Sequence, residues 1–159
     1  LWLLDPVHGW APGHSPFARL QQAPKHQLAD PALALRLLNL SGPSLITPRG
    51  AHMAGPLFES LATLSVRVAA QAAEAHIGHL RTRNGDREID LIVESHDGTI
   101  LAIEVKHAAG VTESDVRHLL WLRDQRRDSV VDLVVVTTGQ HAYRRPDGVA
   151  VIPLALLGA

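Results

Sequence analysis

The chain has 159 residues, 46% of them apolar and 19% charged, and its formal net charge is −1 with neutral histidines. This length and composition indicate a globular domain with a sizeable core and room for a short additional segment. Because there is no overall basic excess, nucleic-acid binding would need a local patch. The absence of cysteine excludes disulfides and thiolate metal sites and fits a cytoplasmic location. No apolar run is long enough to predict a membrane span.

The N-terminal part of the sequence predicts little regular structure. Residues 1–4 could form a strand, and several prolines and glycines then interrupt any longer element as far as residue 24. Asp30 and Pro31 predict the start of a helix, since aspartate caps free amides and proline suits the first helical position. We expect this helix to bury a leucine stripe: Leu33, Leu37, Leu38 and Leu40. Residues 41–55 are expected to form a loop, so the chain divides into segments 1–54 and 55–159.

The second segment shows alternating helix and strand patterns. A helix is predicted from Pro56 to about Ala75, with a buried apolar face at helical spacing: Leu57, Leu61, Leu64 and Val68. Strands are predicted at 77–83, 88–94, 100–106, 130–136 and 148–153. A further helix is expected to end near residue 127; Thr112 caps it, and Asp115, three residues on, completes a capping-box variant. This order predicts an α/β fold with a mixed sheet flanked by helices.

Charged residues interrupt the strands of the predicted hairpin at 88–106. Alternation should place the apolar residues of its first strand on one face: Ile89, Leu91 and Val93. Asp90, Glu104 and Lys106 are unusual, because charges in apolar strands are costly unless they are paired or bind a metal. Glu104 and Lys106 are two residues apart and should share a face. An alternative interpretation is an ordinary ion pair on an edge strand.

These residues resemble the motif of the PD-(D/E)XK nuclease superfamily. Asp90 is followed, after thirteen residues, by Glu104-Val105-Lys106. The resemblance implies a restriction-endonuclease-like αβββαβ core in which Glu59 is the helical acid, Asp90 and Glu104 are the strand acids and Lys106 is the lysine. The proline that precedes the aspartate in that superfamily is replaced by Ile89. For Glu59, an acid that merely stabilises a helix N-terminus is the alternative.

A narrower resemblance covers roughly residues 10–150. The segments PKHQLADPALA, GPLFESL, REIDLIVE and AIEVK, in this order, are similar to a C-terminal module of unknown function in bacterial and archaeal AAA-type ATPases. The resemblance implies an ATPase domain N-terminal to this module, with residues 1–54 containing the end of a winged-helix segment. The chain itself lacks the G-x-x-x-x-G-K-[ST] motif and therefore that kind of ATP site.

The resemblance also implies a Mg²⁺ or Mn²⁺ cofactor. Asp90 and Glu104 would supply carboxylate oxygens, Val105 a main-chain carbonyl, and Glu59 a direct or more distant contact. Lys106 would orient or deprotonate the attacking water and stabilise the developing charge. Without metal, the two strand carboxylates should repel each other and raise the pKa of at least one of them.

Two functions remain open from the sequence. The intact acids and lysine favour metal-dependent hydrolysis of nucleic acid, with DNA as the expected substrate. The weak basic character favours an inactive module that binds nucleic acid or protein and regulates the ATPase. Around the first turn, Arg81, Arg83 and Arg87 could contact phosphates. His76 and His79 have loose metal-ligand spacing, but a solvated pair is expected, and His107 should face away from Lys106.

Overall fold

The computed structural model describes residues 3–11, 23–82 and 85–158. Two short strands, β1 (Leu4–Val7) and β2 (Lys25–Leu28), form an antiparallel pair. Next come helix α2 (Pro31–Leu37), a 3₁₀ turn (Gly42–Ile46) and the long helix α3 (Ala51–Ala72). The main sheet contains β3 (His76–Arg81), β4 (Glu88–Glu94), β5 (Ile100–Lys106), β6 (Val130–Thr137), β7 (Tyr143–Arg144) and β8 (Ala150–Pro153). Helix α4 (Glu113–Gln125) connects β5 to β6, and a 3₁₀ turn (Leu154–Leu156) follows β8.

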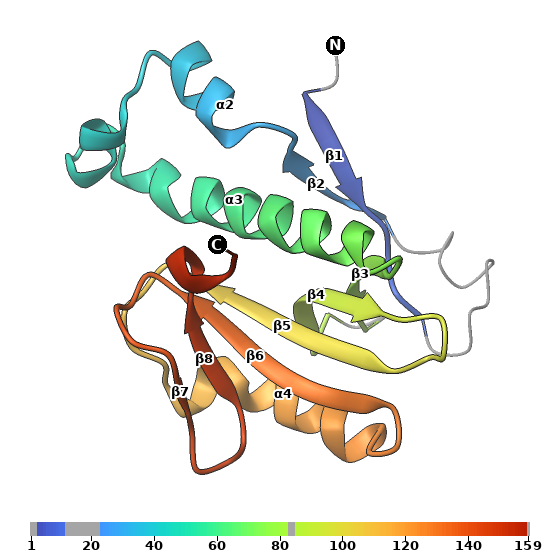
Figure 1. The fold of residues 1–159 in the computed structure, drawn as a ribbon. Coiled ribbons are helices and arrows are strands. Elements are labelled where there is room, and N and C mark those ends of the chain that lie inside the picture. Colours follow the sequence, from blue (N-terminus) through green and yellow to red (C-terminus); the bar gives the residue numbers. More distant parts are fainter. Residues whose placement is uncertain (1–2, 12–22, 83–84, 159) are drawn as a thin grey trace.

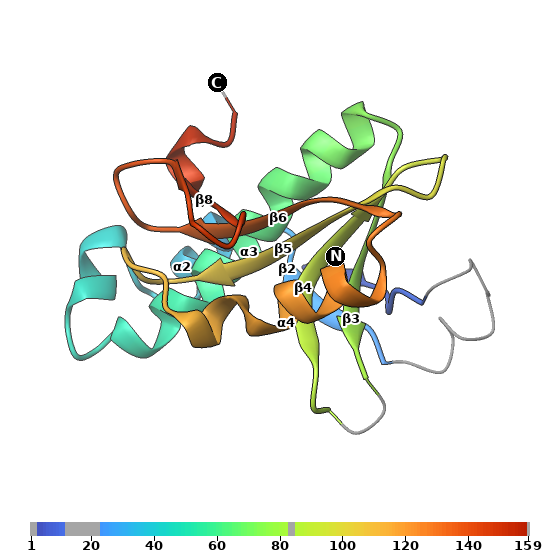
Figure 2. The ribbon, with the colours of Figure 1, turned by 90° about the horizontal axis from the view of Figure 1, so that it is seen from below.

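The main sheet is mixed and has the strand order β3-β4-β5-β6-β8-β7. Strands β3, β4 and β5 are antiparallel neighbours, whereas β5, β6 and β8 run parallel and β7 is antiparallel to β8. Helix α3 covers one face of the sheet and α4 the other, as Figures 1 and 2 show. The sequence prediction of an α/β fold with a mixed, helix-flanked sheet is confirmed. No helix in the described ranges is both long and apolar enough to cross a bilayer.

Each face of the sheet has its own apolar core. The α4-side core includes residues of β4, β5, β6 and α4: Ile92, Ala102, Leu133, Val116 and Leu119. The α3-side core includes residues of the same strands and of α3: Leu91, Ile103, Val136, Ala62 and Val66. Successive strand residues point to opposite faces, and both faces are covered, so the central strands are almost continuously apolar.

The predicted burial of the two N-terminal helices is wrong in detail. Helix α2 begins at the expected cap, with Asp30 accepting from two main-chain amides, but it is only seven residues long. Of its leucine stripe only Leu40, beyond the helix, is buried, and the side chain of Leu37 is 67% exposed. In α3, Leu57 is buried as predicted, but Leu61 and Val68 are exposed, and the buried face consists largely of small residues: Ala54, Ser60, Ala62, Thr63 and Ala70. Small side chains let this helix lie close to the sheet, so its hydrophobic pattern did not identify the face.

Helix α3 also begins earlier than predicted. The amides of Gly50 and Ala51 both donate to the Thr47 carbonyl, which continues the preceding 3₁₀ turn directly into the helix. Pro56 therefore lies inside the helix, and Glu59 lies well beyond its first turn, where no acid occurs. The helix-terminus explanation of Glu59 requires a first-turn position and does not apply.

A bulge in β4 changes the direction of the side chains around Asp90. Gly78 pairs with Ile92, but Leu80 pairs with Ile89, so β4 contains one residue more than β3 between the two pairs. Ile89 consequently packs in the α4-side core, whereas Leu91 packs in the α3-side core, contrary to the predicted single face. Asp90 lies within this irregularity. Bulges commonly redirect side chains next to functional sites.

The N-terminal segment covers part of the β3 edge. The main chain of His79 bonds to His8 and Trp10, through a 3.0 Å bond from the His79 amide and a 2.6 Å bond to its carbonyl. Such pairing protects an edge strand that would otherwise expose free main-chain groups. His79 is only 2% exposed, so the expected solvated histidine pair is wrong. Burial, and secondly the charge of Lys25, lower the pKa of its imidazole.

Candidate active site

The candidate site lies where strands β4 and β5 separate. The ladder between them pairs Leu91 with Ile103 and continues toward the hairpin turn, but no pair follows in the other direction. Asp90 and Glu104 are the next residues beyond this last pair, one on each strand. The Val105 amide donates to Asp90 Oδ2 at 2.9 Å. The Asp90 carboxylate thus takes the place of a main-chain partner between the two strands.

Glu104 and Lys106 extend from β5 toward the start of helix α4. Lys106 Nζ lies 2.9 Å from Glu104 Oε1 and 3.9 Å from Oδ1 of Asp115. Asp115 also accepts from the amide and hydroxyl of Thr112, in the predicted capping box of α4. Glu104 Oε2 is buried and has no hydrogen-bond partner among the described residues. The motif lysine is therefore held by two carboxylates, and one of them keeps an unused oxygen.

The electrostatics of this pair follow from burial and from the second strand acid. Burial, and next the negative charge of Asp90, raise the pKa of Glu104 to about 7, although Lys106 partly offsets both. Burial would lower the pKa of Lys106, but the carboxylates of Glu104, Asp90 and Asp115 outweigh it and raise that pKa. Lys106 is consequently an ammonium at neutral pH in the metal-free protein. It can donate hydrogen bonds and stabilise negative charge, but it is not a free base.

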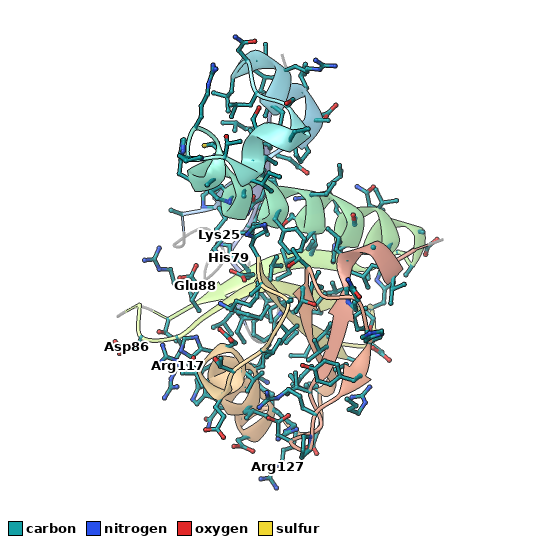
Figure 3. All side chains as sticks on the ribbon, turned by 90° about the vertical axis from the view of Figure 1, so that its left-hand side faces the viewer. Lys25, His79, Asp86, Glu88, Arg117 and Arg127 are labelled. Atoms are coloured by element: carbon teal, nitrogen blue, oxygen red, sulfur yellow. The ribbon has the colours of Figure 1, made fainter. Side chains whose placement is uncertain are left out.

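A second lysine binds the carboxylates on the other side of Asp90. Lys25 Nζ, from β2, lies 2.8 Å from Glu88 Oε1, 2.9 Å from Asp90 Oδ1 and 3.8 Å from Glu59 Oε1. Burial acts to lower the pKa of Lys25, but Asp90, Glu88 and Glu59 together raise it. Figure 3 shows Lys25 and Glu88 grouped with His79 beside helix α3.

Helix α3 positions Glu59 through a chain of hydrogen bonds. Gln27 Nε2 donates to Glu59 Oε1 at 2.8 Å, and Ser60 Oγ donates to Gln27 Oε1 at 2.7 Å. A cleft of about 460 Å³ opens beside these groups. Its walls come from β2, α3 and the start of β4: Lys25, His26, Gln27, Leu28, Pro56, Glu59, Ser60 and Glu88.

Two of the three arginines expected near phosphate lie within the described residues. Arg87 lies over the ring of Trp121, with its guanidinium carbon 5.4 Å from the ring centre. Arg81 pairs with Glu88 in the β3–β4 register. Arg83 lies outside the described residues. His107 contacts the ring of Phe58 in α3, on the face opposite Lys106 and Asp115, as the alternation predicted.

The structure thus divides the predicted acids between two lysines. Glu104 pairs with Lys106, Glu59 and Asp90 contact Lys25, and the charge of Asp90 acts on Glu104 across the strand gap. Sequence reasoning missed Lys25 and Glu88 as members of the site. One signal was present, because Lys25 and Lys106 are the only lysines among fifteen basic residues. Both lie in this site, whereas every other basic residue is arginine.

The site can offer a cation two carboxylates and main-chain oxygen. Within the described ranges, no group of three or more His, Asp or Glu side chains is placed to hold a metal ion. Mg²⁺ does not require one, since it usually keeps several waters and binds one or two protein carboxylates. The buried oxygen of Glu104 that has no partner among the described residues, on the strand next to Asp90, fits such a site.

Fold and site define an α/β domain with a carboxylate–lysine centre between two central strands. The family model described as Domain of unknown function (DUF4143) matches residues 54–157, from helix α3 to the C-terminal turn. The chain therefore belongs to the DUF4143 family. Comparisons with curated proteins and with solved structures give no match.

Proposed function

We propose that this module hydrolyses phosphodiester bonds of nucleic acid with Mg²⁺ or Mn²⁺, and that DNA is its substrate. The observation that carries the proposal is that Asp90 and Glu104 directly follow the last β4–β5 pair, that the charge of Asp90 acts on Glu104, and that Lys106 Nζ lies 2.9 Å from Glu104. The order α3-β3-β4-β5-α4-β6 supports it, because this is the αβββαβ order of the PD-(D/E)XK nucleases that the sequence resembles.

Asp90, Glu104 and the Val105 carbonyl would hold the metal. The N–H and C=O of one strand residue point to the same edge, and the Val105 N–H is directed to Asp90. The Val105 carbonyl is therefore well placed for a role beside both carboxylates. Glu59 contacts Lys25 and Gln27 and would act at a distance, through those side chains or water.

A bound cation would polarise a phosphate oxygen and lower the pKa of an attacking water. The protein's own contribution would come mainly from Lys106. As an ammonium, Lys106 can hold the water and stabilise negative charge that develops on the phosphate, in a partly buried setting where such contacts are strong. Asp115 and Glu104 keep the lysine oriented toward the site. The cleft beside Lys25 and Glu59 would receive part of the substrate.

A second candidate is a nuclease-fold module that binds and regulates without cleaving, as part of a larger ATPase. Three observations favour it. The net charge is −1, Arg87 is engaged with Trp121, and Lys25 already pairs with one oxygen of Asp90. In this case an ATPase domain N-terminal to the module would be the regulated partner, and nucleic acid or protein would be the ligand.

Replacing Asp90 by asparagine should abolish metal-dependent cleavage. Asparagine keeps an acceptor for the Val105 amide but removes the charge that holds the cation. The assay measures Mg²⁺- and Mn²⁺-dependent cleavage of single-stranded DNA, duplex DNA and RNA. Asp132→Asn is the matched control, because Asp132 pairs with Arg144 on another part of the sheet.

The outcomes separate the two candidates. Cleavage by the wild type and by Asp132→Asn, but not by Asp90→Asn, is the expected result. A wild-type protein that binds metal and nucleic acid but cleaves none of the three substrates would contradict the nuclease proposal and favour the binding module. Equal cleavage by Asp90→Asn would show that the activity belongs to another site.

A further inference from the structure

One member of the site comes from outside the segment that matches the family. Lys25 belongs to strand β2, whereas the match covers residues 54–157. Its ammonium nevertheless contacts Glu88 and Asp90 at 2.8 and 2.9 Å, and its side chain is only 22% exposed. Strand β2 thus delivers a positive charge to carboxylates that the family domain supplies.

We propose that Lys25 is a built-in cation that competes with the divalent metal for Asp90, so that the position of strand β2 controls metal loading. The inference rests on the proposed metal site, and it adds the means by which that site is opened and closed.

The oxygens of Asp90 carry the argument. Oδ2 accepts from the Val105 amide at 2.9 Å, and Oδ1 accepts from Lys25 at 2.9 Å. A metal bound to Asp90 would share one of these oxygens, and Oδ1 is the one held by a side chain that can move. An ammonium and a dication on one carboxylate oxygen repel each other strongly in a partly buried site. Metal binding therefore favours withdrawal of Lys25.

The neighbouring acids balance the charge when a dication replaces the Lys25 ammonium. Glu59 and Glu88 lie 3.8 and 2.8 Å from Lys25 Nζ, so the ammonium neutralises acids from both α3 and β4. When the ammonium leaves, a dication at Asp90 supplies the missing positive charge to the same group. The two cations are thus alternative occupants of one negatively charged region.

Strand β2 contacts α3 through polar groups, whereas β1 is also anchored in the core through Val7, which is 1% exposed. Arg67 pairs with Asp5 of β1 at 2.6 Å, and the Leu28 amide of β2 donates to Ser60 Oγ at 3.3 Å. Gln27 adds the bonds to Glu59 and Ser60 described above. Movement of β2 relative to α3 would break these contacts and remove Lys25 from Asp90 together.

The test measures Mn²⁺ binding by calorimetry on the full chain. Lys25→Met keeps the length and apolar stem of the side chain but removes the charge, and we expect it to bind Mn²⁺ at least about tenfold more tightly than the wild type. Lys25→Arg keeps the charge and should show no such gain. Arg144→Met removes the same charge at a distant ion pair with Asp132 and should leave the affinity unchanged.

Hydrogen exchange provides a second measurement on the unaltered protein. Mn²⁺ should accelerate amide exchange in residues 25–28 of the wild type, and Asp90→Asn should abolish that effect. Equal or weaker Mn²⁺ binding by Lys25→Met, with unchanged exchange in β2, would overturn the inference while leaving the metal site intact. Absence of Mn²⁺ binding in both proteins would overturn the metal site itself. Tighter binding by Lys25→Met supports the inference whether or not the protein cleaves DNA.

Discussion

Lys106→Ala is expected to lower metal-dependent DNA cleavage on the order of 10²–10³-fold, the usual effect of removing one preorganised electrostatic contact. Metal binding should remain, because the oxygens that hold the cation belong to Asp90, Glu104 and Val105. Lys106 instead acts on the water and on the charge that develops in the transition state. Its ammonium is fixed 2.9 Å from Glu104 and 3.9 Å from Asp115, so alanine removes a preorganised group.

The measurement combines single-turnover cleavage with Mn²⁺ titration, both at about pH 8.5. This pH is chosen because the pKa of Glu104 is about 7 with Lys106 present and should rise further without it. Asp90→Ala, as the comparison variant, should lose metal and activity together. Cleavage at full rate by Lys106→Ala would assign the activity to another site or to a contaminating enzyme.

Glu104→Gln is expected to stabilise the metal-free protein at high pH. Burial and the charge of Asp90 raise the pKa of Glu104 from 4.5 to about 7. The folded protein therefore keeps this proton over a pH range in which the unfolded chain has lost it. The stability that the protonated group contributes is fully present below about pH 4.5 and is lost as the pH rises through 7.

The size of the effect follows from the same pKa. The change from 4.5 to about 7 corresponds to about 3 kcal/mol of unfolding free energy. Glutamine resembles the protonated acid and avoids the loss, so the variant should match the wild type near pH 4 and exceed its stability by up to about 3 kcal/mol at pH 8.5.

Urea unfolding in the presence of a chelator, from pH 4 to 8.5, tests this prediction. Glu74→Gln is the matched control, because Glu74 is an exposed acid just beyond the end of α3 and far from the strand carboxylates in the sequence. Saturating Mg²⁺ should reverse the order, since the metal stabilises only the protein that keeps both carboxylates. A Glu104→Gln variant less stable than the wild type at pH 8.5 without metal would mean that the ionised acid is a structural partner of Lys106.

The regular part of the domain could be predicted because its sequence signals are local. The alternation of apolar and polar residues predicted β4 and β5, and the charges within these strands indicated the site. Thr112 with Asp115 indicated the start of α4. The bulge at Asp90 has no comparable signal within β4, which contains no glycine or proline, although Gly78 stands beside it in the partner strand β3. It depends on how β3 pairs with β4, which is a tertiary property.

The N-terminal contribution could not be predicted for a related reason. Strands β1 and β2 are four residues each, and β1 contains Pro6, so neither shows a clear strand pattern. Their position depends on contacts with α3, such as the pair between Asp5 and Arg67. Lys25 therefore reaches the site through packing between segments far apart in the sequence. Only the scarcity of lysine in the chain hinted at its role.

The central claim is that Asp90 and Glu104 share a divalent cation beside Lys106. Crystals of the full chain soaked in Mn²⁺ and measured for anomalous scattering test it most directly. We expect one strong peak between the two carboxylates, with an oxygen of each at roughly 2.1 Å, the distance typical of Mg²⁺ sites. Carboxylates more than roughly 8 Å apart, too far to share a cation at such distances, or no peak between them at saturating Mn²⁺, would contradict it.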